Sequence, residues 1–227
     1  MISFLFQLVS IFVFGCLLAC GSVSSSGIAT APAAEPQATP NAMNSVPANK
    51  QIAVFAGGCF WGVEAVFENV KGVIDVKSGY SGGTAKTANY DAVSDGSTKH
   101  AEAVQITFDP AKVSYEQLLE VFFKVVHDPT ELNRQGPDTG PQYRSAIFYT
   151  DETQKQATMS YIEKLGAAGV YKKPIATQVI ALEKFYDAEA YHQDYLPQNL
   201  DSPYIIAHDL PKLENLKKQF PAFYAKK

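Results

Sequence analysis

The segment that most constrains the fold is an apolar run that ends in two glycines and continues with the periodicity of a helix. Residues 51–55 have the composition of a buried strand, and Gly57-Gly58 ends it. From Phe60 to Asn69 the apolar residues recur with helical spacing. A strand that turns directly into a helix predicts a layered fold in which the helix packs back against a sheet.

The patterns that follow extend this unit into the order β-α-β-β-α-β. Further strands are predicted at 72–80, 103–108, 145–149 and 177–182, and further helices at 114–125 and 151–165. This order matches a split βαβ arrangement, so we expect an α+β fold, a two-layer α/β sandwich of the ferredoxin-like type. Loops are predicted at 82–99 and 128–142. Proline recurs in the last forty or so residues, which predicts a largely irregular C-terminal extension.

The N-terminal segment differs sharply in composition from the rest. Residues 1–49 contain no Lys, Arg, His or Asp, and their single acidic residue is Glu35. Residues 2–19 are mostly apolar, which suits a signal-peptide core better than a membrane span, although no positive residue precedes it. Leu17-Leu18-Ala19-Cys20 resembles a bacterial lipoprotein cleavage box. We therefore expect a lipoprotein-type signal peptide at 1–19 and lipid attachment at Cys20; the alternative is an uncleaved N-terminal anchor.

The segment after the signal peptide predicts a tether rather than a folded unit. After Cys20, residues up to 50 are mainly Ser, Ala, Pro, Thr and Asn, and this composition cannot bury a core. We expect 20–50 to be a lipidated, disordered tether and 51–227 to be the folded domain. The protein would then be exported and lipid-anchored to a bacterial membrane, facing the periplasm or the exterior.

Charge excludes one class of partner, and histidine spacing disfavours one class of cofactor. No basic run stands out and the formal net charge is −4, so we expect no nucleic-acid partner. The four histidines match no zinc-binding spacing and no cysteine pair accompanies them, so we expect no metal site. They are His100, His127, His192 and His208.

Cys59 is the residue with the clearest chemical potential. The other two cysteines, Cys16 and Cys20, lie in the N-terminal segment, so Cys59 is the only thiol expected to stay free. It falls at the predicted strand-to-helix turn, and a helix N-terminus can lower a cysteine pKa from about 8.5 to about 3.5–7.5. The alternative is a buried, inert cysteine. Its neighbours are two glycines and two large aromatics, which predicts a reactive thiolate beside a small apolar pocket.

Six short segments, in a fixed order, give this chain a resemblance to a known family. They are Gly57-Gly58-Cys59-Phe60-Trp61-Gly62, Gly79-Tyr80-Ser81-Gly82-Gly83, His100-Ala101-Glu102-Ala103-Val104, His127-Asp128-Pro129, the run from Arg134 to Ser145, and His192-Gln193-Asp194-Tyr195-Leu196. Together they resemble the signature of the A-type peptide methionine sulfoxide reductases, over about residues 51–200. The resemblance implies that 51–227 is a catalytic reductase domain.

The resemblance also implies a reaction and a set of site residues. The reaction is reduction of the S epimer of methionine sulfoxide, free or in proteins, and hence repair of oxidised proteins under oxidative stress. Cys59 matches the family nucleophile, which ends as a sulfenic acid. Glu102 matches the acid, whose pKa an apolar pocket would raise. The other matches are Tyr80 and Tyr143 for the sulfoxide oxygen, Phe60 and Trp61 for the substrate methyl group, and Asp138, which orders the site.

One departure from the family pattern concerns the last step of the cycle. Many members carry C-terminal cysteines that resolve the sulfenic acid as a disulfide, whereas this chain reads Ser202-Pro203-Tyr204-Ile205-Ile206 and has no cysteine after Cys59. We therefore expect no bound cofactor and recycling by an external thiol, such as thioredoxin, glutaredoxin or glutathione. We expect the protein to be a monomer.

Two other functions remain open on the sequence. A single-cysteine peroxidase would also form a sulfenic acid, but it would be expected to carry a threonine a few residues before the thiol, where this chain has Ala56-Gly57-Gly58. A lipid-tethered binding module with a spent thiol is the second alternative. Turnover of a small sulfoxide with dithiothreitol would distinguish the reductase from these two alternatives.

Overall fold

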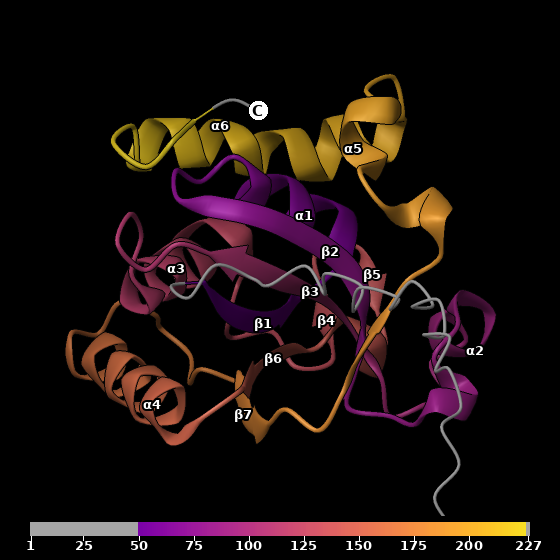
Figure 1. Cartoon of the computed structure of the whole chain (residues 1–227), viewed down its shortest axis with the longest axis horizontal. Helices are drawn as coiled ribbons and strands as arrows, with labels where there is room; N and C mark the ends of the chain where they lie inside the picture. Colours follow the sequence, from indigo (N-terminus) through magenta and orange to yellow (C-terminus); the bar gives the residue numbers. More distant parts are fainter. Residues whose placement is uncertain (1–49, 226–227) are drawn as a thin grey trace, which may run out of the picture. The chain divides into compact units, whose positions relative to one another are not determined.

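Six strands form one sheet with the order β7-β6-β1-β3-β2-β8 (Figure 1). The structure is a computed structural model that describes residues 50–225 of the chain, all within one compact unit. The predictions of a signal peptide at 1–19 and a lipidated Cys20, and nearly all of the predicted tether, lie outside the described residues. The strands are β1 Gln51–Gly57, β2 Val73–Ser81, β3 Ala101–Phe108, β6 Ser145–Tyr149, β7 Gln178–Ala181 and β8 Phe185–Asp187.

The four inner strands confirm the predicted split βαβ arrangement. β1 lies between β3 and β6 and is antiparallel to both, and β2 pairs antiparallel with the far side of β3. The two edge strands come later in the sequence: β7 is parallel to β6, and β8 is antiparallel to β2. The register places Tyr80 of β2 opposite Glu102 of β3, so these two side chains lie on one face of the sheet.

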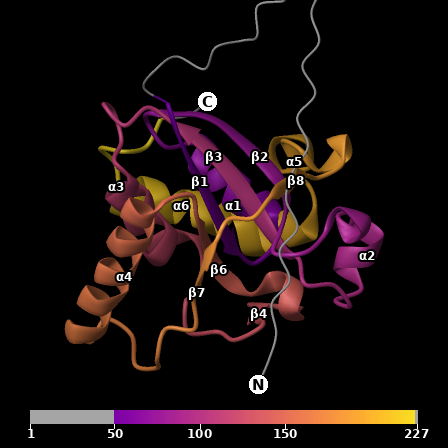
Figure 2. The same cartoon turned by 60° about the horizontal axis from the view of Figure 1, so that its bottom comes forward.

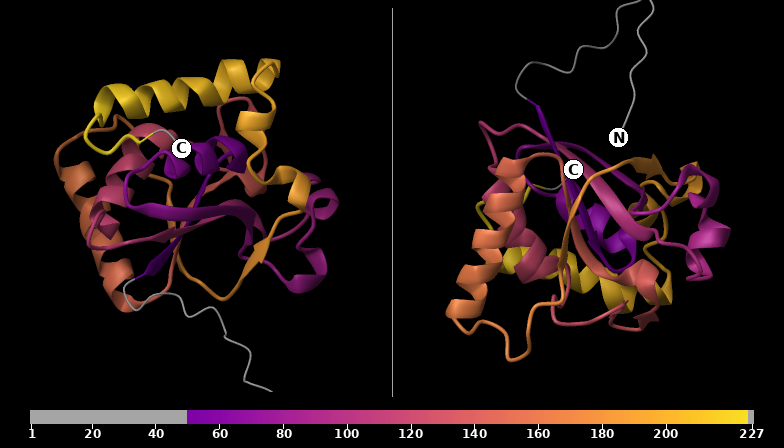
Figure 3. Two further views of the ribbon diagram at one scale, coloured as in Figure 1. Left: turned by 45° about the horizontal axis from the view of Figure 1, so that its top comes forward. Right: turned by 90° about the horizontal axis from the view of Figure 1, so that it is seen from below.

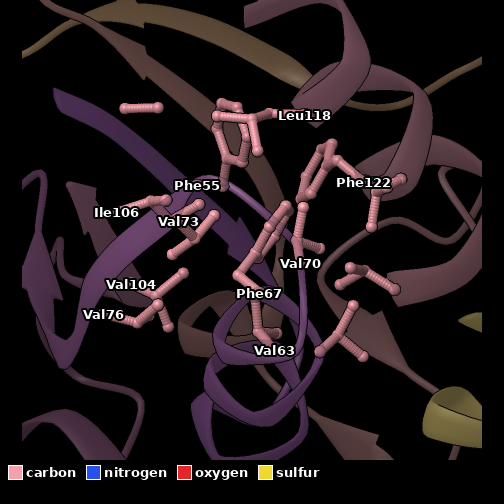
Figure 4. Close-up of a cluster of buried hydrophobic side chains, with 14 of the residues drawn as sticks. Phe55, Val63, Phe67, Val70, Val73, Val76, Val104, Ile106, Leu118 and Phe122 are labelled. Atoms are coloured by element: carbon pink, nitrogen blue, oxygen red, sulfur yellow. The ribbon is translucent and has the colours of Figure 1, made fainter. Parts of the chain in front are cut away.

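Helices cover one face of this sheet and enclose the main core. The helices are α1 Phe60–Glu68, α3 Tyr115–Val121 with a π-helical turn at Phe122–Val126, α4 Glu152–Ala167 and α6 Leu210–Gln219. Figure 4 shows how Phe67 of α1 and Phe122 pack against Phe55 of β1. Phe55 is fully buried, with its ring 5.6 Å from that of Phe67 and 4.9 Å from that of Phe122. Since β1 and α1 share this core, its packing fixes the turn between them.

A thinner apolar layer lies on the opposite face of the sheet. Alternate residues of β1, Val54 and Ala56, point there and are fully buried beside Phe148 of β6. The extended segment between β7 and β8 runs from one edge of the sheet to the other, as Figure 2 shows, and packs Leu182 and Phe185 against this layer. This extended segment therefore connects the two edges of the sheet and leads into β8, which pairs with β2.

The C-terminal extension contains more regular structure than predicted. It holds β8, a short helix α5 (Tyr195–Gln198), a π-helical turn (Ile205–Asp209) and the ten-residue α6. α6 lies along α1 (Figure 3). The recurring prolines misled the prediction because Pro211 stands in the first turn of α6, where a missing N–H costs no hydrogen bond.

The predicted loops also contain short elements. They are a 3-10 turn at Ala85–Thr87, α2 at Tyr90–Ser94, the hairpin of β4 (Arg134–Gln135) and β5 (Asp138–Thr139), and a 3-10 turn at Pro141–Tyr143. The predicted cap of α3 is confirmed, since Ser114 Oγ accepts from the Gln117 N–H and the Gln117 side chain accepts from the Ser114 N–H. No helix within residues 50–225 is long and apolar enough to cross a membrane.

Candidate active site

Cys59 lies at the junction of β1 and α1, where it is the N-cap residue of the helix. Gly58 has φ +94°, a left-handed conformation that favours glycine. A Cβ at this position would also lie 2.8 Å from the Gln135 side chain, so the turn needs glycine twice over. The turn brings Cys59 under surrounding side chains, and only 8% of its surface is exposed.

The expectation of a depressed thiol pKa is wrong for the protein as it stands. Burial raises the pKa of Cys59 well above its ordinary value, and the charges of Glu102 and Asp209 raise it further. The backbone N–H of Trp61 and the charge of Lys212 oppose this rise but do not overcome it. The lowering of the Cys59 pKa by the helix N-terminus is therefore smaller than the rise caused by desolvation, so the thiol is protonated when no substrate is bound.

Glu102 lies next to the start of the same helix. Its Oε2 accepts a hydrogen bond of 3.1 Å from the backbone N–H of Phe60, the first residue of α1, and its surface is 2% exposed. Burial raises the pKa of Glu102 to about 8; the Phe60 N–H opposes that rise and the charge of Asp138 adds to it. At pH 7 this carboxyl group is therefore mainly protonated and can donate a proton beside Cys59.

The two aromatic residues after Cys59 are held in place by the C-terminal extension. The Trp61 ring stacks on that of Tyr195 with centroids 3.7 Å apart and planes 10° apart. Its Nε1–H donates to His192 Nδ1 at 3.1 Å, and the His192 ring also lies 5.0 Å from that of Phe60. Phe60 is buried, so the two rings form a fixed apolar wall at the start of α1.

Tyr80 does not have the geometry expected of a group that holds the substrate oxygen. Its hydroxyl donates to Glu189 Oε2 at 2.8 Å, and the residue is fully buried beneath the Phe60 ring. The other carboxylate oxygen of Glu189 accepts from the backbone N–H of Tyr90 at 2.9 Å. Tyr80 therefore acts indirectly: it holds the Glu189 carboxylate, which in turn fixes the backbone of Tyr90, the first residue of α2.

Tyr90 is one of two site residues that were not predicted from the sequence. Its bond to Glu189 uses the backbone, which leaves the phenol hydroxyl available. Burial raises the pKa of Tyr90, and the charges of Glu102 and Cys59 raise it further, as they also do for Tyr143. Both phenols therefore remain protonated donors near the thiol. The available signal was that Tyr90 is the only aromatic residue in the predicted loop 82–99.

Asp138 connects the β4–β5 hairpin to the C-terminal extension. Its Oδ2 accepts a short hydrogen bond, 2.5 Å, from the hydroxyl of Tyr204, whose ring stands edge-on to Trp61. Tyr204 was not singled out in the sequence, where it appeared only within the region that lacks the family cysteines. Asp138 thus orders Tyr204 directly and, through the Tyr204 ring, the edge of Trp61. Among residues 50–225 no group of three His, Cys, Asp or Glu side chains could hold a metal ion.

Comparisons with known proteins agree on one family. The family model described as peptide methionine sulfoxide reductase matches residues 51–223. The chain is 55% identical over 177 residues to peptide methionine sulfoxide reductase MsrA 2 of Mesorhizobium japonicum, which covers 78% of this chain and 91% of that protein. It is 53% identical over 180 residues to MsrA 2 of a Synechocystis strain, covering 79% of this chain and 84% of the relative.

Solved structures are similar in fold as well as in sequence. Reduced Mxr1 from Saccharomyces cerevisiae matches with a TM-score of 0.64 and 33% identity, covering 69% of this chain and 89% of that one. Methionine sulfoxide reductase A of Corynebacterium diphtheriae matches with a TM-score of 0.59 and 33% identity, covering 67% and 76% of the two chains.

Proposed function

Since the chain belongs to the peptide methionine sulfoxide reductase family, we propose here how its own residues perform and complete that reaction. The protein is a peptide-methionine (S)-S-oxide reductase, an enzyme that reduces methionine sulfoxide in protein repair. One observation carries the mechanism: the buried Glu102 carboxyl, whose pKa burial raises to about 8, accepts from the first amide of the helix that Cys59 caps. A thiol and an acid are thereby held at one helix end.

The proposed first step transfers the sulfoxide oxygen to Cys59. Glu102 protonates the oxygen, which makes the sulfoxide sulfur electrophilic, and the phenols of Tyr90 and Tyr143 hold the oxygen by hydrogen bonds. The Cys59 sulfur attacks the sulfoxide sulfur and forms a sulfur–sulfur bond. The hydroxyl group then passes to the Cys59 sulfur, the substrate sulfur–oxygen bond and the sulfur–sulfur bond break, and methionine leaves with the electron pair. Glu102 regains a proton from the thiol, so that the products are a thioether and Cys59 sulfenic acid. The raised pKa of the resting thiol fits this relay, since the thiol loses its proton only after Glu102 has given its own proton to the substrate oxygen and can accept another.

Tyr90→Phe should lower kcat/KM by about 10-fold or more, because one of the two phenols that hold the sulfoxide oxygen is lost. Tyr80→Phe is the matched control, since it makes the same change in a nearby, more deeply buried tyrosine whose hydroxyl contacts Glu189 instead of the substrate. It should keep kcat/KM within about threefold and lower stability by about 1 kcal/mol, the usual contribution of one hydrogen bond. Equal losses of activity in the two variants, measured with one sulfoxide substrate, would contradict the assignment of Tyr90.

Recycling should proceed without an internal disulfide. The sequence has no cysteine after Cys59, so the sulfenic acid has no intramolecular partner in the domain. A protein that begins at Lys50, given methionine sulfoxide and no reductant, should release about one methionine per Cys59 and gain the mass of one oxygen. With glutathione added, its mass should rise by one glutathione instead. Loss of two hydrogens, or a covalent dimer, would show another route.

The reductant and the cellular location are proposed from the sequence alone. An external thiol, either a thioredoxin-like protein or glutathione with a glutaredoxin, would reduce Cys59. Cleavage before Cys20 would leave a lipid-anchored domain, exported and held by the tether at 20–50. Cys20→Ala should then move the protein from the membrane fraction to the soluble fraction, and Cys16→Ala should not. Retention of both variants in the membrane would favour an uncleaved anchor.

A further inference from the structure

A buried ion pair of the C-terminal extension lies against the first turn of α1. Asp209 is fully buried, and its Oδ1 accepts from Lys212 Nζ at 3.0 Å. Its Oδ2 is also buried and has no hydrogen-bond partner among the described residues. The Lys212 side chain is only 17% exposed. Burying two charges costs several kcal/mol per ion, and such pairs are often no more stabilising than apolar residues, so stability alone does not account for this one.

The Asp209–Lys212 pair can approach the start of α1 because Gly62 has no side chain. A Cβ on Gly62 would lie 2.1 Å from Asp209 Oδ1 and 2.8 Å from Lys212 Nζ, so the two charged groups occupy the space above this glycine. Gly62 is the third residue of α1, and Cys59 is its N-cap. The backbone N–H of Trp61, the second residue of α1, acts on the Cys59 thiol, which places the sulfur beside this turn. The ion pair and the thiol therefore lie over the same helical turn.

Two opposing charges of this pair act on the thiol. The charge of Asp209 raises the pKa of Cys59, and the charge of Lys212 opposes it by a smaller lowering. Lys212 also lowers the pKa of His127, whose ring would lie 3.3 Å from a Cβ on Gly57 at the end of β1. The titratable and charged groups that interact with the thiol from the elements around it are Glu102 of β3, Tyr90 of α2, Tyr143, Tyr204, Asp209 and Lys212. Three further groups lie behind them: Asp138 acts on Glu102, His127 is acted on by Lys212, and His192 bonds Trp61.

We propose that Lys212, anchored by Asp209, is the cation that stabilises the Cys59 thiolate, both as attacking group and as leaving group. The proposal rests on the proposed role of Cys59 as the nucleophile. In regeneration, an external thiol condenses with the sulfenic acid to give a mixed disulfide and water. A second external thiolate then attacks the sulfur of the first, a new disulfide forms between the two, and the electron pair of the broken bond leaves on Cys59. Both halves of the cycle thus place negative charge on the sulfur under Lys212.

Alkylation of Cys59 by iodoacetamide at several pH values tests this directly, in the full chain, with the Cys59 peptide followed by mass spectrometry. Lys212→Met should raise the pH midpoint of alkylation by about half to one unit, which slows alkylation about 3- to 10-fold at pH values below the midpoint. Asp209→Asn should lower the midpoint by a similar amount. Lys217→Met is the matched control, because Lys217 forms an exposed pair with Glu214 on the same helix and should leave the midpoint unchanged.

The opposite signs separate an electrostatic role from a structural one. Both Lys212→Met and Asp209→Asn break the same ion pair, so a purely structural effect would shift the two profiles in the same direction. Shifts in one direction, or no shift in either variant, overturn the proposal. If Lys212→Met does not fold, Asp209→Asn decides alone, since an unchanged or raised midpoint overturns it. The readout needs no sulfoxide, so a wild-type protein that fails to reduce sulfoxide would refute the proposed function and leave this test standing.

Discussion

Replacing Cys59 by serine should reduce sulfoxide turnover to the background rate. The serine hydroxyl is similar in size to the thiol but is a far weaker nucleophile, because it remains protonated at neutral pH and its oxygen is less polarisable. Turnover can be measured as methionine released from a methionine sulfoxide substrate with dithiothreitol as reductant. The same assay with the wild-type protein fixes the rate against which the loss is judged.

The fold should survive this substitution. Cys59 is the N-cap of α1 and makes no capping hydrogen bond through its side chain, whereas serine is among the preferred N-cap residues. Thermal unfolding of Cys59→Ser should therefore occur at a temperature equal to or slightly above that of the wild type. A folded Cys59→Ser protein with undiminished turnover would refute the assignment of Cys59 as the nucleophile.

Glu102→Gln should lower kcat/KM by about 10²–10⁴, the usual contribution of a general acid. The glutamine oxygen can still accept from the Phe60 N–H, so the geometry at the start of α1 should be kept while the acidic proton is lost. Cys59 should remain open to alkylation, which provides the control for an intact site. A decrease of less than about threefold would mean that another group donates the proton.

The pH profile gives a second and independent test of Glu102. Burial raises its pKa to about 8, and the reaction needs the protonated form. The wild-type rate should therefore decline as the pH rises through about 8, because the acid is then lost. In Glu102→Gln this descending limb should disappear from the profile of the residual activity. A limb that persists unchanged in the variant would assign that titration to a different group.

The inner sheet and the turn at Cys59 could be predicted because their signals are local. Three patterns depend only on residues close together in the sequence. They are the alternation of β3, the helical spacing of α1 and the Ser114–Gln117 cap. The C-terminal helix was missed because Pro211 counts as a helix breaker unless its exact place in the first turn is known.

The errors within the site have a common cause, which is contact between distant parts of the chain. Tyr80 lies on the predicted strand beside Glu102, yet its hydroxyl is occupied by Glu189, 109 residues further along. The pKa of Cys59 follows the helix position only until burial is known, and that burial depends on side chains brought in by other elements. Neither the partner of a hydroxyl nor the desolvation of a thiol can be inferred from neighbouring residues.

The burial of Cys59 has a consequence for survival among oxidants. A thiol that was ionised at rest would react with peroxide, and further oxidation of its sulfenic acid to sulfinic acid is irreversible for most proteins. Only 8% of Cys59 is exposed and its raised pKa keeps it protonated, so a passing oxidant meets an unreactive group. The sulfur becomes reactive when a bound sulfoxide takes the proton of Glu102. The Cys59 thiol is thereby protected from the oxidants that convert methionine to its sulfoxide.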